Sequence, residues 1–183
     1  NLSGDPSLDY LQRAIPNLLI TSFERSEQLR VTTWERMRDL MKQLDLEDAE
    51  LADRELGFEL CKLDAVDTIV VGGFTRAGNV FATDVKVLDV GSKRLLASST
   101  AKGEGVGSIL ASQVDQLSRD ILLALDMPQR DMEAIGSSVV EVTTGSMEAY
   151  ESFLRGRECY EKLYNTDARR LLEETVRIDP EFA

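Results

Sequence analysis

The sequence predicts an α/β fold, with helices packed on a mixed sheet that includes an antiparallel meander. The first observation is residues 66–99, where apolar, β-branched runs alternate with two turn signals and so indicate three consecutive strands. The second is the helical spacing of apolar side chains on both sides of that segment, over residues 8–23 and 110–125. With 183 residues, 43% of them hydrophobic, the chain can bury one ordinary core and a short additional element.

The meander can be justified strand by strand. Residues 68–74 are almost all apolar or β-branched, which is typical of a strand buried on both faces. Gly78 and Asn79 tolerate positive φ, so the chain can reverse direction there. Residues 80–90 then alternate between the two faces of the sheet, and a second turn leads into a strand over residues 94–99.

Three helices are expected before the meander. The first begins at a cap formed by Asp5 or Ser7 and contains Pro16, which either kinks it or starts a second helix. A short strand is expected over residues 29–32. The other two helices are expected over residues 34–44 and 49–63, each with a stripe of apolar side chains.

After the meander, a glycine-rich turn over residues 103–108 leads into a helix whose apolar face should pack on the sheet. Residues 128–145 combine a proline, two glycines and several hydroxyl side chains, which indicates a linker with one candidate strand over residues 138–142. From Ser146 onward, two helices joined near Asn165 should form an αα-hairpin.

The composition argues against several classes of function. The chain has 33 acidic and 21 basic residues and a net charge of -12, whereas proteins that bind nucleic acid or an anionic membrane need clustered Lys and Arg. It has no histidine, and Cys61 and Cys159 lack the spacing of a metal or redox site, so no metal, no cofactor and two free thiols are expected. No apolar run reaches 18 residues, so no direct membrane insertion is expected.

No catalytic constellation emerges from the sequence. The turn over residues 103–108 lacks the Lys and Ser/Thr ending of a phosphate loop, and Glu104 would repel phosphate, so a strand-to-helix turn capped by Ser108 is the better interpretation. The carboxylates between residues 45 and 55 fall on helical segments and suit a solvated acidic face. The chain is therefore not predicted to be an enzyme.

Several short motifs occur in a fixed order along the first part of the chain. They are Asn-Leu-Ser-Gly-Asp-Pro at residues 1–6, Asp-Tyr-Leu at 9–11, Arg-Glu-Leu-Gly at 54–57, Gly-Gly-Phe-Thr-Arg-Ala-Gly-Asn at 72–79, Val-Leu-Asp-Val at 87–90 and Gly-Glu-Gly at 103–105. Together they resemble the TolB amino-terminal-like domain of bacterial multidomain proteins, which is also similar to the flagellar protein FlgO and the secretion lipoprotein CsgG. In that family an apolar strand precedes the first motif, so a sheet without it is expected to have a gap or an exposed edge that another chain can pair with.

The last part of the chain resembles the start of a tetratricopeptide (TPR) array. Gly156, Ala168, Leu172 and Pro180 match the small, small, large and proline positions of that repeat. One repeat cannot bury its own face, so the hairpin should pack on the first domain, pair with another copy or begin a longer array. The expected organisation is a TolB-like domain over residues 1–127, a linker over 128–145 and a TPR-like hairpin over 146–183.

An aromatic stripe at helical spacing is the candidate partner-binding site. Its members are Tyr150, Phe153, Tyr160 and Tyr164. Most of this stripe suits packing within the repeat, but one face of a TPR helix can also line a peptide groove.

The resemblances imply a non-catalytic protein-interaction or sensory module of a larger bacterial signalling or regulatory protein. Such a module would bind a protein or peptide through the sheet edge and the TPR surface, and a homodimer would use either of the same two surfaces. The alternatives are a structural component of an envelope assembly and a sensor that binds a small molecule in a closed apolar pocket. An extracytoplasmic, periplasmic location is favoured over a cytoplasmic one.

Overall fold

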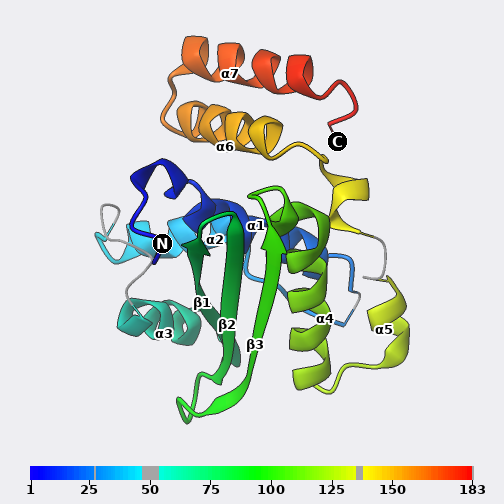
Figure 1. Cartoon of the computed structure of the whole chain (residues 1–183). Coiled ribbons are helices and arrows are strands. Elements are labelled where there is room, and N and C mark those ends of the chain that lie inside the picture. The colour runs from blue at the N-terminus through cyan, green and yellow to red at the C-terminus, as the bar shows by residue number, and fades with distance from the viewer. Residues whose placement is uncertain (27, 47–53, 135–137, 183) are drawn as a thin grey trace.

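The computed structural model describes residues 1–26, 28–46, 54–134 and 138–182. A three-stranded sheet is flanked by helices, and a helical hairpin lies at one end of this unit (Figure 1). The α/β class and the meander predicted from the sequence are therefore confirmed.

The sheet consists of β1 (Thr68–Ala77), β2 (Val80–Asp89) and β3 (Leu95–Glu104), in that spatial order. Gly78 adopts a φ of +61° in the turn between β1 and β2, a conformation that costs glycine little because it has no Cβ. Both strand pairings are antiparallel. A mixed sheet contains at least one parallel pair of strands, and the described residues contain none. The sheet is therefore antiparallel and not mixed as predicted.

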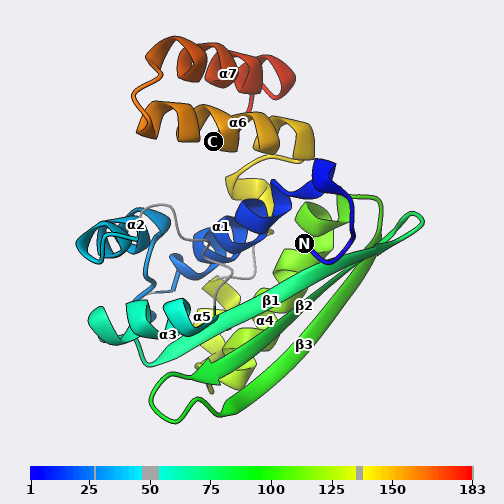
Figure 2. The ribbon, with the colours of Figure 1, turned by 90° about the vertical axis from the view of Figure 1, so that its left-hand side faces the viewer.

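One face of the sheet packs on α1 (Leu11–Phe23) and α4 (Val114–Ala124), as Figure 2 shows. Alternate residues of β2 reach this core, and Phe81, Val85 and Val87 are buried in it. Pro16 lies inside α1 and does not begin a second helix. A short 3-10 helix, η1 (Pro6–Leu8), precedes α1, and a π-helical turn, η2 (Ile109–Gln113), leads into α4.

Two further helices lie on the β1 side of the sheet (Figure 1). They are α2 (Trp34–Gln43) and α3 (Arg54–Leu63). Leu40 and Met41 of α2 pack with Leu56 and Leu60 of α3 in one small core, and Phe58 of α3 packs on the sheet in another. The sequence predicts this last helix over residues 49–63. Its predicted start lies outside the described residues, and its predicted end at Leu63 is confirmed.

The C-terminal hairpin consists of α6 (Met147–Glu161) and α7 (Asn165–Ile178). The two helices approach closely at Gly156, where a Cβ would lie 2.9 Å from the side chain of Leu172. The Ser152 hydroxyl also donates a hydrogen bond to the carbonyl of Leu171, with an O···O distance of 2.9 Å. These contacts join α6 and α7 into one unit.

The segment over residues 128–145, interpreted above as a linker, carries two short elements. They are α5 (Gln129–Ala134) and the 3-10 helix η3 (Val139–Val142). Val139 is fully buried in the main core, and its backbone N–H donates to the carboxylate of Asp115 in α4 at 3.0 Å. This part of the chain therefore packs against the first domain.

Two strands predicted from the sequence are wrong. Residues 29–32 form neither helix nor strand, although Leu29 and Val31 pack against the main core. Residues 138–142 include η3, whose first turn is closed by a hydrogen bond from the Val140 N–H to the Ser138 hydroxyl. In both segments, β-branched residues pack in the core without pairing to a neighbouring strand. Their apolar character suits burial in any backbone conformation, so it does not by itself indicate a strand.

Candidate partner-binding surface

The hairpin is held against the first domain along one face of α6. Met147, Tyr150 and Leu154 belong to the main core, so this face of α6 is buried together with α1. At the other end of α6, Arg13 forms an ion pair with Glu158, with 2.7 Å between the nitrogen and the oxygen. Of the three arrangements expected for the hairpin, the structure shows packing on the first domain.

A second polar contact continues this interface. The Arg157 guanidinium donates to the side-chain oxygen of Asn17 in α1 at 3.0 Å and lies 3.8 Å from the Glu35 carboxylate of α2. Arg38 of α2 pairs with Glu161. Helices α1 and α2 thus both contact α6 through charged side chains.

Two of the four predicted binding residues lie in an aromatic cluster. Tyr150 is buried, and its ring centroid lies 6.0 Å from that of Phe153 and 6.4 Å from that of Phe182. Burial raises the pKa of Tyr150 to about 12, because the ionised phenolate is poorly solvated there. These residues hold the base of the hairpin on the core, and Tyr150 is not available to a partner.

The other two predicted residues are on the surface. Tyr160 is 64% exposed and Tyr164 is 60% exposed. They line different grooves, so the structure does not bring the four aromatic residues together.

The larger groove, of about 640 Å³, lies between α6 and α7. Tyr160 of α6 forms one wall, and α7 contributes an apolar line with a polar rim. The α7 residues are Ala168, Leu172 and Val176, with Asn165, Arg169 and Glu173 beside them. Leu172 and Val176 were missed as candidates, although their spacing from Ala168 in steps of four marked them as one helix face.

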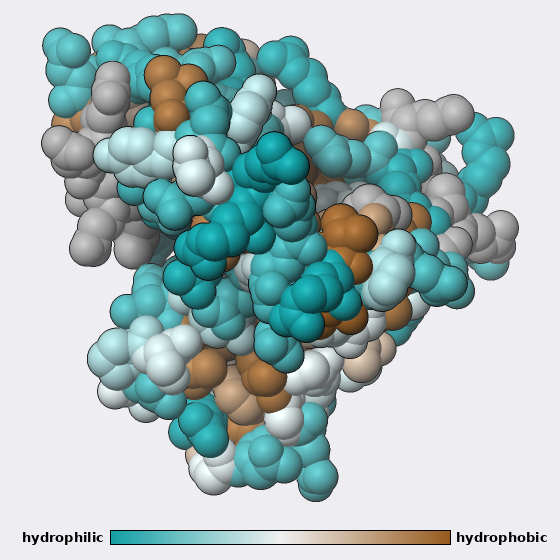
Figure 3. Space-filling model, turned by 90° about the horizontal axis from the view of Figure 1, so that it is seen from above, coloured by the Kyte–Doolittle hydropathy of each residue, from teal (hydrophilic) through white to brown (hydrophobic). Residues whose placement is uncertain are grey.

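The smaller groove, of about 280 Å³, lies on the opposite flank of α7 and contains Tyr164. Its lining is largely charged: Arg155, Glu158, Lys162, Asp167 and Arg170 all reach it. Glu158 and Lys162 already pair with each other at 2.7 Å. Seen from above, hydrophilic side chains cover most of the hairpin and hydrophobic ones form only small patches (Figure 3).

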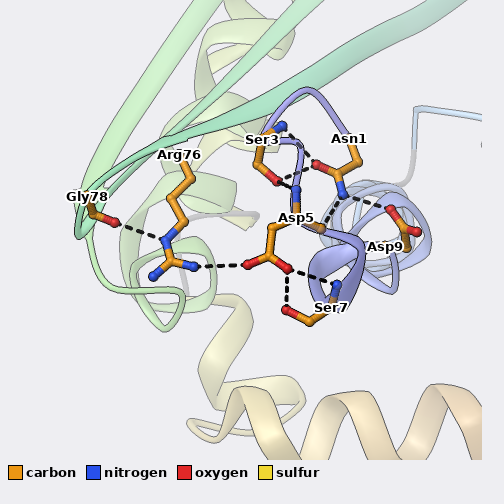
Figure 4. A network of polar contacts seen from close by, with 7 residues as sticks. All are labelled: Asn1, Ser3, Asp5, Ser7, Asp9, Arg76 and Gly78. Atoms are coloured by element: carbon orange, nitrogen blue, oxygen red, sulfur yellow. Dashed lines mark hydrogen bonds and ion pairs between the residues drawn. The ribbon is translucent and has the colours of Figure 1, made fainter.

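The first motif of the chain forms a polar network against the β1–β2 turn (Figure 4). The Asn1 side-chain oxygen accepts a hydrogen bond from the Ser3 N–H at 2.9 Å, and Arg76 donates to the Asp5 carboxylate at 3.2 Å. Hydrogen bonds from Ser7 lower the pKa of Asp5. The motif thus anchors the start of the chain to the sheet, and its polar groups bond to one another.

The glycine-rich turn is a packing device. A Cβ on Gly103 would lie 2.4 Å from the Cβ of Ser108, so only glycine fits. The Ser108 hydroxyl donates to the Gly105 carbonyl and does not cap the helix, which corrects the expected role of Ser108. The buried Gln113 amide donates to Ser108 at 2.8 Å and accepts from Thr83 at 2.8 Å.

Within the described ranges, no group of three or more acidic or cysteine side chains is arranged to hold a metal ion. Cys61 and Cys159 are both free and half-buried. In the same ranges, no helix has the length and apolar character needed to cross a membrane.

No family model matches the chain, and no curated protein matches it. Among solved structures, it is similar to the LpoB C-terminal domain from Salmonella enterica, with a TM-score of 0.37 and 12% sequence identity over 39% of this chain. The match spans 54% of that domain. At this TM-score the likeness defines neither the fold nor the function of the chain, and the resemblance to TolB-like domains stays a prediction.

Proposed function

We propose that the chain is a non-catalytic protein-interaction module whose α6–α7 hairpin binds an amphipathic helix of a partner protein. The observation that carries this proposal is the apolar groove between Tyr160 and α7. Val176 is 55% exposed and Tyr160 is 64% exposed, so a partner that covers them removes apolar surface from water.

The shape of the groove supports a helix as the ligand. Ala168, Leu172 and Val176 recur every four residues and form one inclined row on α7. A partner helix that lies along this row would insert side chains spaced three and four residues apart, with Tyr160 as a wall.

Charge supports a partner helix with a basic polar face. At the rim, Arg169 and Glu173 already pair at 2.8 Å, and both are exposed, so this pair contributes little to selectivity. The whole chain has a net charge of -12, which attracts basic partners and raises their association rate. The apolar groove and the acidic character of the whole chain together favour a helix with apolar residues on one side and Lys or Arg on the other.

A sensory role would use α6 as the connection. Tyr160 of α6 lines the groove, while its neighbours Arg157 and Glu161 contact α1 and α2. A partner that shifts Tyr160 would also shift Arg157 and Glu161, and so would weaken or strengthen the contacts of α6 with the first domain. By resemblance to TolB-like domains, the same change would reach an attached signalling domain, and the module would be extracytoplasmic. Fractionation of cells that produce the whole protein tests that location.

The first test measures binding of a model helix. The probe is a fluorescein-labelled amphipathic peptide with leucines on one face and lysines on the other, and its control is the same composition in scrambled order. Fluorescence anisotropy should detect binding of the amphipathic peptide alone. Val176→Glu and Tyr160→Ala should each weaken it at least tenfold.

The matched control is Tyr164→Ala, which removes an equally exposed tyrosine outside the apolar groove and should change affinity less than twofold. Equal loss in Tyr164→Ala, or binding of the scrambled peptide, would contradict a site at the groove. Light scattering over a concentration series distinguishes the second candidate function, a self-assembling envelope component. In that case the wild-type chain dimerises, and Val176→Glu makes it monomeric.

A further inference from the structure

The outer edge of β3 presents unpaired backbone groups. The Gly105 N–H bonds to the Asn79 carbonyl at 2.7 Å, and residues 80 and 104 lie opposite each other in the register. In an antiparallel ladder the hydrogen-bonded residues alternate, so the odd-numbered residues from Ala97 to Gly103 bond to β2. The register shifts at Leu96, so the alternation holds only from Ala97 onward. The even-numbered residues of this stretch therefore point their N–H and C=O groups away from the sheet: Ser98, Thr100 and Lys102.

The opposite edge of the sheet differs, because the start of the chain partly covers it. The Leu2 N–H bonds to the Phe74 carbonyl of β1 at 2.9 Å, and a Cβ on Gly73 would touch the Leu2 side chain at 3.1 Å. The network of Asp5 and Arg76 holds this segment in place. Within the described ranges, no backbone hydrogen bond joins a segment other than β2 to Ser98, Thr100 or Lys102 of β3.

A helix packs on the face of the sheet close to this edge. It is α4, which shares the main core with β2, and the Ser99 hydroxyl of β3 donates to Asp120 of α4. Leu123 of α4 is 60% exposed, and Leu95 and Leu96 of β3 are 54% and 50% exposed. A strand added to β3 would thus find backbone partners on one side and exposed apolar side chains near its end.

Local charge indicates what such a strand would carry. Residues 95–101 of β3 are uncharged, while Lys93 and Arg94 precede them and Lys102 follows. Glu104, two residues further on, is the acidic residue of this strand. Lys93 already pairs with Glu55 at 2.6 Å, so Arg94 and Lys102 are the basic residues that flank the neutral centre of this edge.

We propose that the open edge of β3 binds an extended segment of a partner protein, which adds to the sheet as a fourth strand. The segment has an uncharged, β-prone centre and acidic residues at its ends, next to Arg94 and Lys102. Main-chain hydrogen bonds to the even-numbered residues supply the affinity, and the flanking charges select the partner. This inference deepens the proposed interaction function with a second surface that is independent of the hairpin groove.

The test uses a labelled peptide as the probe. It is acetylated, carries fluorescein, and has alternating valines and threonines between two glutamates at each end. Anisotropy should show binding to the wild-type chain, and Thr100→Pro should weaken it at least tenfold because it removes an outward N–H. Thr100→Ala keeps that N–H and should change affinity less than twofold. Lys102→Glu should weaken binding, and a peptide with lysines in place of the glutamates should bind more weakly.

Two further measurements make the result decisive. Circular dichroism shows whether Thr100→Pro is folded. If it is unfolded, the wild-type chain is titrated instead with a peptide that is N-methylated at every second residue and so lacks half of its N–H donors. Weaker binding of this peptide supports strand addition, and equal binding contradicts it. Val176→Glu should leave binding of the extended peptide unchanged, so failure of the hairpin groove and failure of the β3 edge are distinguishable. The proposal is overturned if the peptide does not bind, if a folded Thr100→Pro binds it equally, or if Thr100→Pro instead dissociates a dimer of the wild-type chain.

Discussion

The carboxylate of Asp64, just after α3, accepts a hydrogen bond from Nε of Arg36 in α2 at 2.8 Å, and Nη2 of Arg36 lies 2.8 Å from the same oxygen in an ion pair. The Thr32 hydroxyl donates a further hydrogen bond to the other carboxylate oxygen at 3.0 Å. Asp64 is buried, whereas Arg36 is half-exposed. These contacts join the segment before α2 to the end of α3, two parts of the chain separated by about 30 residues in sequence.

The hydrogen bond from Arg36 lowers the pKa of Asp64 below its ordinary value. A carboxyl whose pKa is depressed in the folded state stabilises it above the unfolded pKa of about 4, and this contribution is lost as the pH falls through the folded pKa. Asp64→Asn should therefore reduce the free energy of unfolding by about 2 kcal/mol at pH 7. Thermal melts between pH 2 and 7 should show a smaller acid dependence in the variant. An unchanged slope would mean that Asp64 does not contribute to acid unfolding.

Gly156→Ala should loosen the hairpin. The added Cβ would meet two carbons of the Leu172 side chain at 2.9 Å and the Leu171 Cβ at 3.3 Å, which costs about 1–3 kcal/mol in a packed interior. The higher helix propensity of alanine returns about 1 kcal/mol. We expect a net loss of about 1 kcal/mol in urea unfolding. Arg155→Ala, one residue away on the exposed side of α6, serves as control, and a more stable Gly156→Ala would show that Leu172 moves freely.

Ser118→Ala should stabilise the protein. Ser118 is fully buried in α4, and its hydroxyl has no hydrogen-bond partner among the described residues. A buried hydroxyl without a partner costs about 1–3 kcal/mol, so its removal should raise the free energy of unfolding by about 1 kcal/mol. Ser152→Ala is the contrasting variant, because that hydroxyl bonds to Leu171 and its loss should destabilise. A destabilised Ser118→Ala would indicate a partner such as a bound water.

Alkaline pH should weaken the attachment of the hairpin. Burial raises the pKa of Tyr150 and of Tyr10 to about 12 each, whereas an unfolded tyrosine titrates near 10. Between pH 10 and 12 the unfolded state loses protons that the folded state keeps, so stability falls as the pH rises. Absorbance titration of the folded chain should show late ionisation of two tyrosines, and Tyr150→Phe should leave one. If Tyr150→Phe removes no late step, Tyr150 is accessible to water.

The helices and the meander could be predicted because their signals are local. Alternation in residues 80–90 reflects one buried face of β2, and the spacing of apolar residues in residues 110–125 reflects one buried face of a helix. The wrong strands at residues 29–32 and 138–142 show the limit of this reasoning. There, β-branched residues fill the core from irregular or 3-10 segments, which no periodicity distinguishes from a strand.

The binding surface could be predicted only in part. Helical spacing grouped Tyr150, Phe153, Tyr160 and Tyr164 on one helix and its end, but it did not show that Tyr150 would be covered by α1 and Phe182 while Tyr160 stays exposed. That division depends on the angle at which α6 docks, which is determined by contacts such as Arg13–Glu158, nearly 150 residues apart.

The sequence by itself determined the α/β class, the two turns of the meander, the hairpin of α6 and α7 and the acidic character of the chain. Each of these depends on neighbouring residues or on composition alone. Only the tertiary structure decided which face of the hairpin is buried and which edge of the sheet is open. The physical reason is that burial and backbone pairing are relations between distant segments, so the exposure of Val176 and the unpaired N–H of Thr100 follow from where other elements pack.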